Sequence, residues 1–128
     1  MADLRIEAEK NSPEIIFDGL TNRLTISGKS YPPNPGLFFS PLFSLLETHL
    51  SQPANKEFIA DIDLVYFNSG SARVLTDLFT KLENAAKNGK IICVNWLYHQ
   101  DDEDNLEFGE EFQEDAEIMA FNLVCKDA

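Results

Sequence analysis

The chain has 128 residues, of which 44% are apolar and 25% are charged, a balance typical of one globular domain with a hydrophobic core. The net charge is −12 and the pI is near 4.4. This charge repels nucleic-acid phosphates and anionic membranes, so we expect no nucleic-acid or membrane partner. No apolar run is long enough to cross a membrane, and the N-terminal residues do not resemble a signal peptide, so we expect a cytoplasmic protein.

The first predicted structure is a hairpin that follows a polar N-terminal segment. Residues 1–12 are polar and are expected to be loosely ordered, before a single domain over residues 13–125. Within that domain, "EIIFD" (14–18) and "RLTISG" (23–28) are rich in apolar and β-branched residues and are separated by turn residues. This pattern predicts an antiparallel β-hairpin.

A proline-rich loop precedes the first predicted helix. Residues 30–36 contain three prolines and a glycine, and the following residues up to about Ser51 have apolar side chains at helical spacing. Two starting points are compatible with this pattern. Either Ser40 caps the helix with Pro41 at its first position, or the helix begins near Asn34 and Pro41 kinks it.

The rest of the chain alternates strands with helices. Residues 56–67 predict a strand that starts half-exposed and ends buried on both faces, and residues 71–88 predict the clearest helix. A strand buried on both faces is expected at 90–98, a short helix within 99–115, and a final strand at 117–124. The order β-β-α-β-α-β-α-β predicts an α/β fold whose sheet is mostly parallel, with an antiparallel hairpin at its N-terminal edge.

The sequence contains no recognisable catalytic or metal-binding pattern. Cys93 and Cys125 have no partner at metal-ligand spacing and are interpreted as small apolar side chains. The acidic cluster of residues 101–107 lacks the spacing of a calcium loop and is interpreted as a solvated loop. There is no P-loop, dinucleotide fingerprint or Ser-His-Asp order. We therefore expect no enzymatic activity, no metal and no cofactor.

The turn "NSGS" (68–71), between the strand that ends at Phe67 and the following helix, allows two interpretations. Ser69 or Ser71 could simply be the N-cap of the helix. Alternatively, one serine could accept a phosphate, because a helix N-terminus has free N–H groups and a partial positive charge that suit an anion. Arg73 lies close enough in sequence to contribute a charge-assisted contact.

Three segments together resemble the SiaC-type regulatory phosphoproteins of bacteria. "ISGKSYPPNPGLFFSPLFSLLE" is similar to their I-S-G-x-S-Y-P-E-N-…-F-Y-x-P-L segment, and "DLVYFNSGSARVLTDLFTKLE" is similar to their L-x-Y-[FL]-N-T-S-S-…-L segment. "VNWLYHQDDEDNLEFGEEF" resembles their V-x-W-x-Y-…-D-D-…-G-E-E-F segment. The resemblance covers roughly residues 14–124, with the three segments in the family's order.

The resemblance implies a fold like that of STAS-type anti-sigma-factor antagonists and a function without catalysis. In this family a dedicated kinase phosphorylates one Ser or Thr, and a PP2C-type phosphatase reverses the modification. In the member that regulates biofilm formation, the unphosphorylated form binds and stimulates a diguanylate cyclase, the enzyme that makes cyclic-di-GMP. The expected function is thus a phosphorylation-controlled partner switch in signal transduction.

By the family motif, the phosphorylated residue falls on Ser69, where the family has Thr. Gly70 replaces the family's Ser, and Pro33 replaces the Glu of the Y-P-E-N motif. The surface expected to bind partners comprises Asn68, Gly70, Ser71, Arg73, Tyr31 and Asn34.

Two other functions stay open from the residues alone. One is a small-molecule-binding or enzymatic α/β domain with a pocket near the carboxyl ends of the strands, around Tyr66, Asn68, Asn95 and Tyr98. The other is a constitutive scaffold that is not phosphorylated.

Overall fold

The computed structural model describes residues 3–53 and 56–127 as one six-stranded sheet with three helices. The elements in chain order are β1 (Leu4–Ile6), β2 (Glu14–Asp18), β3 (Arg23–Ser30), α1 (Pro35–Ser51), β4 (Phe58–Phe67), α2 (Ser69–Lys87), β5 (Ile92–Tyr98), α3 (Glu103–Asp115) and β6 (Ala120–Cys125). No helix in this part of the chain is long and apolar enough to cross a membrane.

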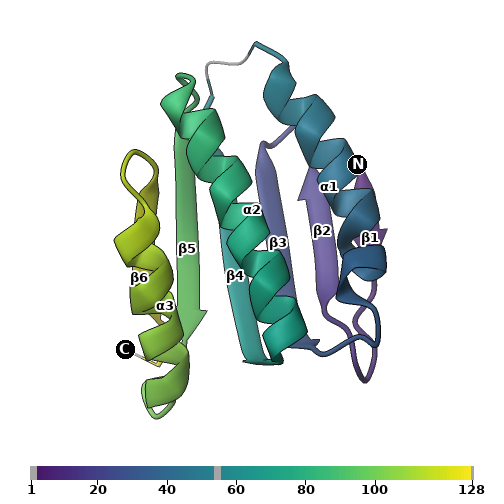
Figure 1. The fold of residues 1–128 in the computed structure, drawn as a ribbon, viewed down its shortest axis with the longest axis vertical. Coiled ribbons are helices and arrows are strands. Elements are labelled where there is room, and N and C mark those ends of the chain that lie inside the picture. Colours follow the sequence, from purple (N-terminus) through teal and green to yellow (C-terminus); the bar gives the residue numbers. More distant parts are fainter. Residues whose placement is uncertain (1–2, 54–55, 128) are drawn as a thin grey trace.

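The sheet has the strand order β1-β2-β3-β4-β5-β6, the same as the chain order. The first two pairings are antiparallel and the last three are parallel. All three helices lie on one face of the sheet, so the molecule has two layers and the second face of the sheet is uncovered (Figure 1). The predicted α/β fold, with its N-terminal hairpin and mostly parallel sheet, is confirmed.

Strand β1 was not predicted. It lies within the polar segment 1–12, where Arg5 is opposite Ile16 of β2, and the N–H of Asp3 donates to the carbonyl of Phe17 at 2.8 Å. Leu4 and Ile6 pack against the core. Three residues are too few to establish an alternating pattern, so this edge strand is recognisable only from its pairing.

Helix α1 begins at the earlier of the two predicted starting points. Asn34 is the N-cap, with its side-chain Oδ1 accepting the N–H of Leu37 at 3.1 Å, and Pro35 occupies the first turn. Pro41 lies inside the helix, on its exposed side. The alternative with Ser40 as the cap is therefore wrong, because an asparagine followed directly by proline supplies both a cap and a pre-set φ angle.

The prediction that β4 ends buried on both faces and that β5 is doubly buried is wrong. Val65 and Tyr66 at the end of β4 are 42% and 53% exposed. In β5, the side chains of Cys93, Asn95 and Leu97 are only half-buried. The physical reason is that helices cover one face alone, so alternate residues of both central strands face the open side.

The open face of the sheet carries paired charges instead of a second apolar layer. Asp61 on β4 bonds to Arg23 at 3.0 Å and accepts the side-chain amide of Asn95 at 2.9 Å. Asp63 forms a salt bridge with Lys126 at 2.9 Å. The first salt bridge links β3 to β4, and the second links β4 to the residue that follows β6. Because each carboxylate has a cationic partner, both can occupy a central strand.

Both cysteines are half-buried free thiols. Cys93 accepts the side-chain amide of Asn122 at 3.4 Å on the open face. Burial raises the pKa of the Cys93 thiol, and the nearby carboxylates of Glu57 and Asp61 raise it further. A thiol with a raised pKa is a poor nucleophile at neutral pH, in agreement with the structural interpretation of this residue.

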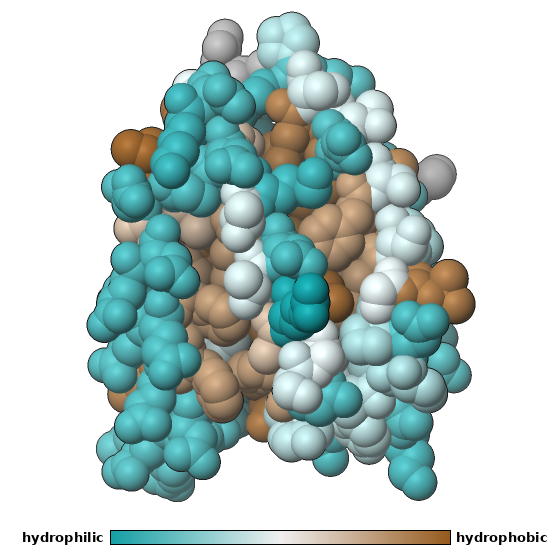
Figure 2. Space-filling view, viewed as in Figure 1, coloured by the Kyte–Doolittle hydropathy of each residue, from teal (hydrophilic) through white to brown (hydrophobic). Residues whose placement is uncertain are grey.

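The core between sheet and helices is centred on α2, whose buried side includes Leu75, Leu78 and Leu82. Hydrophobic residues are visible in the groove between α2 and the hydrophilic surface of α3 (Figure 2). Glu83 of α2 is buried in the lining of the hollow between α2 and α3 and accepts the backbone N–H groups of three consecutive residues, 117–119, at 2.9–3.2 Å. Burial acts to raise the pKa of Glu83, but these hydrogen bonds and Lys87 outweigh it and lower the pKa below its usual value.

Helix α3 approaches the sheet closely over Trp96 of β5. The Trp96 side chain is 1% exposed and its Nε1 donates to the carbonyl of Asn105 at 3.0 Å. A Cβ at Gly109 would lie 2.5 Å from Cδ1 of Trp96. The glycine is therefore what allows the helix to rest on the indole ring.

Candidate functional site

The helix N-termini gather at one edge of the molecule. The parallel strands β3, β4 and β5 end at this edge, and α1, α2 and α3 each begin there (Figure 1). Parallel crossovers produce this arrangement because each strand leads directly into the helix that returns over the sheet. The edge thus combines loop residues with the positive ends of three helix dipoles.

The turn "NSGS" caps α2 at this edge. Asn68 is the N-cap, and its side-chain Oδ1 accepts the N–H of Ser71 at 2.9 Å. The interpretation in which Ser69 or Ser71 is the cap is therefore wrong. Asn68 precedes both serines and has the extended backbone, φ −90° and ψ 179°, that an N-cap requires.

Ser69 is the first residue of α2, and its side chain is exposed. Among the described residues, the backbone N–H groups of Ser69 and Gly70 have no acceptor within hydrogen-bonding distance. The first turn of α2 contains no acidic residue. Arg73 is exposed one turn further along the helix. An anion attached at Ser69 would therefore meet two free donors and a nearby cation, with no carboxylate on the same turn.

Ser71 has a different environment from Ser69. It is 1% exposed, and its hydroxyl is 2.7 Å from the hydroxyl of Ser30, which is fully buried at the end of β3. The carbonyl of Ser30 also accepts the N–H of Asn68 at 3.1 Å. Ser71 therefore links the start of α2 to the end of β3 inside the protein. Of the two serines, only Ser69 is accessible to another protein.

The other predicted partner-binding residues, Tyr31 and Asn34, lie on the loop between β3 and α1. Asn34 is exposed and caps α1, and Tyr31 is half-buried with its ring against that of Tyr66, at a centroid distance of 5.6 Å. A Cβ at Gly70 would lie 3.0 Å from Cγ of Pro35. The close approach of α1 and α2 at this point gives a physical reason for a glycine at position 70.

The alternative site around Tyr66, Asn68, Asn95 and Tyr98 is not assembled as one pocket. Asn95 lies on the open face of the sheet, bonded to Asp61, and lines a shallow depression there. A pocket beside Tyr66 does exist, but it is completed by residues of α3 and excludes the other three.

The acidic cluster of residues 101–107 holds the start of α3. Asp102 is its N-cap and accepts the N–H of Asn105 at 3.0 Å. In the two described ranges there is no group of three or more His, Cys, Asp or Glu side chains arranged to hold a metal ion.

Asn105 and Phe108 were not identified as site residues from the sequence, although both line the pocket beside Tyr66. One signal was available. Asn105 stands at helical spacing with Phe108 and Phe112, so it is a polar residue within the apolar stripe of α3. A side chain of this kind has to find hydrogen-bond partners in a buried setting.

Comparisons with known proteins agree with this architecture. The model of the SiaC family of regulatory phosphoproteins matches residues 6–126. An uncharacterised protein of Pseudomonas aeruginosa strain UCBPP-PA14 is 31% identical over 116 residues, which cover 91% of each chain. The crystal structure of apo-SiaC from Pseudomonas aeruginosa is 30% identical, with a TM-score of 0.88 over 98% of this chain and 100% of that chain.

A further solved structure is that of the diguanylate cyclase SiaD in complex with its activator SiaC, also from Pseudomonas aeruginosa. Its matching chain is 30% identical, with a TM-score of 0.87 over 94% of this chain and 99% of that chain. The family model spans almost the whole sequence, and the TM-score of 0.88 shows that this chain has the fold of the solved apo-SiaC structure. This chain belongs to the SiaC family of regulatory phosphoproteins.

Proposed function

We propose that this protein is a binding partner whose affinity is controlled by phosphorylation of Ser69, and that it has no catalytic activity of its own. The observation that carries the proposal is the contrast within the turn: Ser69 is exposed beside two unpaired N–H groups, whereas Ser71 is buried against Ser30. A kinase can reach Ser69 without unfolding the protein, and a phosphate there leaves the helix intact.

The control is electrostatic and steric. A partner that packs against the start of α2 has to cover whatever is attached to Ser69. Arg73 balances only part of the charge of a phosphate, and burying the rest against a partner that supplies no cation costs several kcal/mol. Since each 1.4 kcal/mol changes a dissociation constant tenfold, a cost of about 4 kcal/mol weakens binding roughly 1,000-fold.

The proposed contact surface surrounds Ser69. Asn68 and Gly70 form the turn, Arg73 extends it along α2, and Tyr31 and Asn34 extend it onto the loop before α1. Ser71 supports this surface from below. A kinase, a PP2C-type phosphatase and a target protein are the partners that this scheme requires, acting in the cytoplasm. The complex of SiaD with its activator SiaC supports a diguanylate cyclase as the class of target, which would place the chain in cyclic-di-GMP signalling and biofilm control.

The first experiment asks whether Ser69 is modified. The protein is purified from its native cells in several growth states, and its intact mass and peptide map are recorded. We expect one phosphate, on the peptide that contains Ser69, in at least one state. A protein that stays unphosphorylated in every state, or is modified elsewhere, would contradict the proposal.

The second experiment measures binding to a diguanylate cyclase from the same genome by calorimetry. We expect Ser69→Ala to bind like the wild type and Ser69→Asp to lose binding. The matched control is Thr80→Asp, which adds the same charge on nearly the same exposed side of α2, eleven residues or about 16 Å further along the helix. This control should bind normally. Equal binding by all four forms would refute the role of Ser69.

A further inference from the structure

A pocket of about 340 Å³ lies beside the candidate site, between the end of β4 and the start of α3. It is lined by residues 65–67 of β4 and by Asp102, Asp104, Asn105 and Phe108. We call it the Phe108 pocket. Ser69 is two residues beyond this lining and is not part of it. The pocket therefore adjoins the proposed control point without including it.

The walls of the Phe108 pocket are exposed apolar and aromatic side chains. Val65 is 42% exposed, Tyr66 is 53% exposed and Phe108 is 42% exposed. The ring of Phe108 also contacts that of Phe67, at a centroid distance of 5.0 Å. Exposed large apolar side chains that cluster at one place mark interaction sites more often than scattered ones do.

Asn105 is the most buried residue of the lining, with 7% of its surface exposed. Its side-chain Nδ2 donates to the carbonyl of Leu64 at 3.2 Å, which fixes the orientation of the amide. Within the described part of the chain, its Oδ1 is buried and has no hydrogen-bond donor. Because this oxygen has almost no accessible surface, a ligand in the pocket does not reach it, and the role of Asn105 is to tie the start of α3 to β4 through its bond to Leu64.

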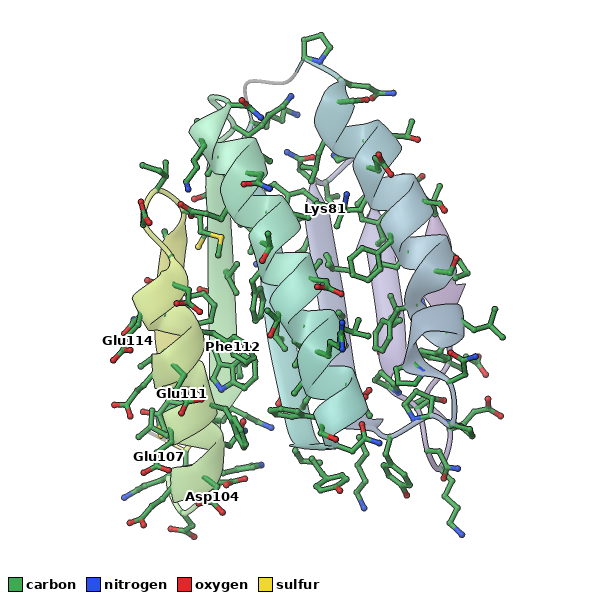
Figure 3. The ribbon with its side chains drawn as sticks, viewed as in Figure 1. Lys81, Asp104, Glu107, Glu111, Phe112 and Glu114 are labelled. Atoms are coloured by element: carbon green, nitrogen blue, oxygen red, sulfur yellow. The ribbon has the colours of Figure 1, made fainter. Side chains whose placement is uncertain are left out.

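The rim of the pocket and the adjoining helix are negatively charged. Seven of the 13 residues of α3 are Asp or Glu, and none is Lys or Arg. Figure 3 shows Asp104, Glu107, Glu111 and Glu114 along this helix, with Phe112 on the side toward α2. None of these four carboxylates forms a salt bridge with another described residue. The surrounding field therefore attracts a cation.

We propose that the Phe108 pocket receives an arginine side chain of the protein partner. An arginine fits both features: its stem and planar guanidinium pack on the aromatic walls, and its N–H donors pair with the carboxylates of Asp102 and Asp104. A lysine would offer fewer donors and no planar face. The partner surface that continues along α3 is expected to be basic.

This inference rests on the proposed function, because it assumes that a protein partner docks at this edge. In this scheme the Phe108 pocket contributes to the affinity for the partner, and phosphorylation of Ser69 regulates that affinity. Different residues carry the two roles. The test below uses neither the partner nor phosphorylation. A negative result with the arginine probe would therefore leave the Ser69 proposal standing. A negative result in the Ser69 experiments would likewise leave the arginine titration unaffected.

The probe is N-acetyl-arginine methylamide, titrated into isotope-labelled full-length protein at physiological ionic strength and followed by NMR. We expect saturable shifts concentrated on Tyr66, Phe67, Asn105 and Phe108. N-acetyl-citrulline methylamide, which has nearly the same shape without the charge, should produce no saturable shift.

Two matched variants separate the pocket from general acidity. Asp104→Asn and Glu114→Gln each remove one exposed carboxylate from α3, but only Asp104 lines the pocket. We expect Asp104→Asn and Phe108→Ala to weaken arginine binding by about fivefold or more, and Glu114→Gln to leave it unchanged. Folding of each variant is checked in the same spectra by the dispersion of the core amides.

Three results would overturn the proposal. The first is the absence of any saturable shift with the arginine probe. The second is an equal response to the citrulline probe, and the third is an equal loss of affinity in Asp104→Asn and Glu114→Gln. The last outcome would mean that arginine is attracted to α3 as a whole and that the pocket does not recognise it.

Discussion

Substituting Gly109 by alanine tests how closely α3 is seated on the sheet. The new Cβ would lie 2.5 Å from Cδ1 and 2.8 Å from Nε1 of Trp96, and 2.9 Å from a methyl group of Leu123. Carbon atoms in contact are normally about 3.5–4.0 Å apart. The indole cannot move aside, because it is 1% exposed and packs against Phe67 and Phe112 at centroid distances of 5.8 and 5.4 Å. Helix α3 would therefore have to move by about 1 Å.

Two contributions lower the free energy of unfolding in this variant, and one raises it. Overpacking a core by one methyl group typically costs about 1–3 kcal/mol. Moving the helix also weakens the hydrogen bond from Trp96 Nε1 to the carbonyl of Asn105, worth about 1 kcal/mol. Against this, alanine is favoured over glycine in a helix by about 1 kcal/mol. The net expectation is that Gly109→Ala destabilises the protein by about 1–3 kcal/mol.

The assay is urea denaturation followed by tryptophan fluorescence, since Trp96 is the single tryptophan. With a slope of about 2 kcal/mol per molar urea, the midpoint should fall by about 0.5–1.5 M. Gly36→Ala is the matched control, because a Cβ there meets only Asn34 Oδ1, at an ordinary 3.8 Å. Its midpoint should stay unchanged or rise slightly. A Gly109→Ala midpoint equal to or above that of the control would refute the close seating of α3.

Two further predictions concern the ends of α2. Glu83→Gln is expected to cost about 1–3 kcal/mol near neutral pH, since the carboxylate accepts three backbone N–H groups. The pKa of Glu83 in the folded protein is below its usual 4.5, so this stabilisation is present above pH 4.5 and is lost as the pH falls through the folded pKa. The difference in stability between the wild type and Glu83→Gln should therefore shrink in thermal melts at acidic pH, and a difference that stays constant would contradict the prediction. Asn68→Ala removes the N-cap of α2 and should cost about 1 kcal/mol in thermal or urea melts. The control Ser69→Ala should change stability by less than about 0.5 kcal/mol, and an equal loss in both variants would argue against the assigned cap.

The sequence by itself determined the succession of strands and helices after residue 12. Periodicity was sufficient for the hairpin and for α2, because their apolar residues recur at spacings of two and of three to four. Ser69 was also indicated by sequence, through a family motif. The burial of β4 and β5 could not be predicted in the same way. A run of apolar residues does not reveal how many layers cover a strand, and here helices cover only one face.

Only the tertiary structure decided which of the two serines is accessible and what lies beside it. Ser71 is buried because β3 brings Ser30 within 2.7 Å of it, from 41 residues away in the sequence. The Phe108 pocket likewise combines the end of β4 with the start of α3. Contacts of this kind depend on the order of strands in the sheet and on the approach of each helix, and local sequence patterns contain neither.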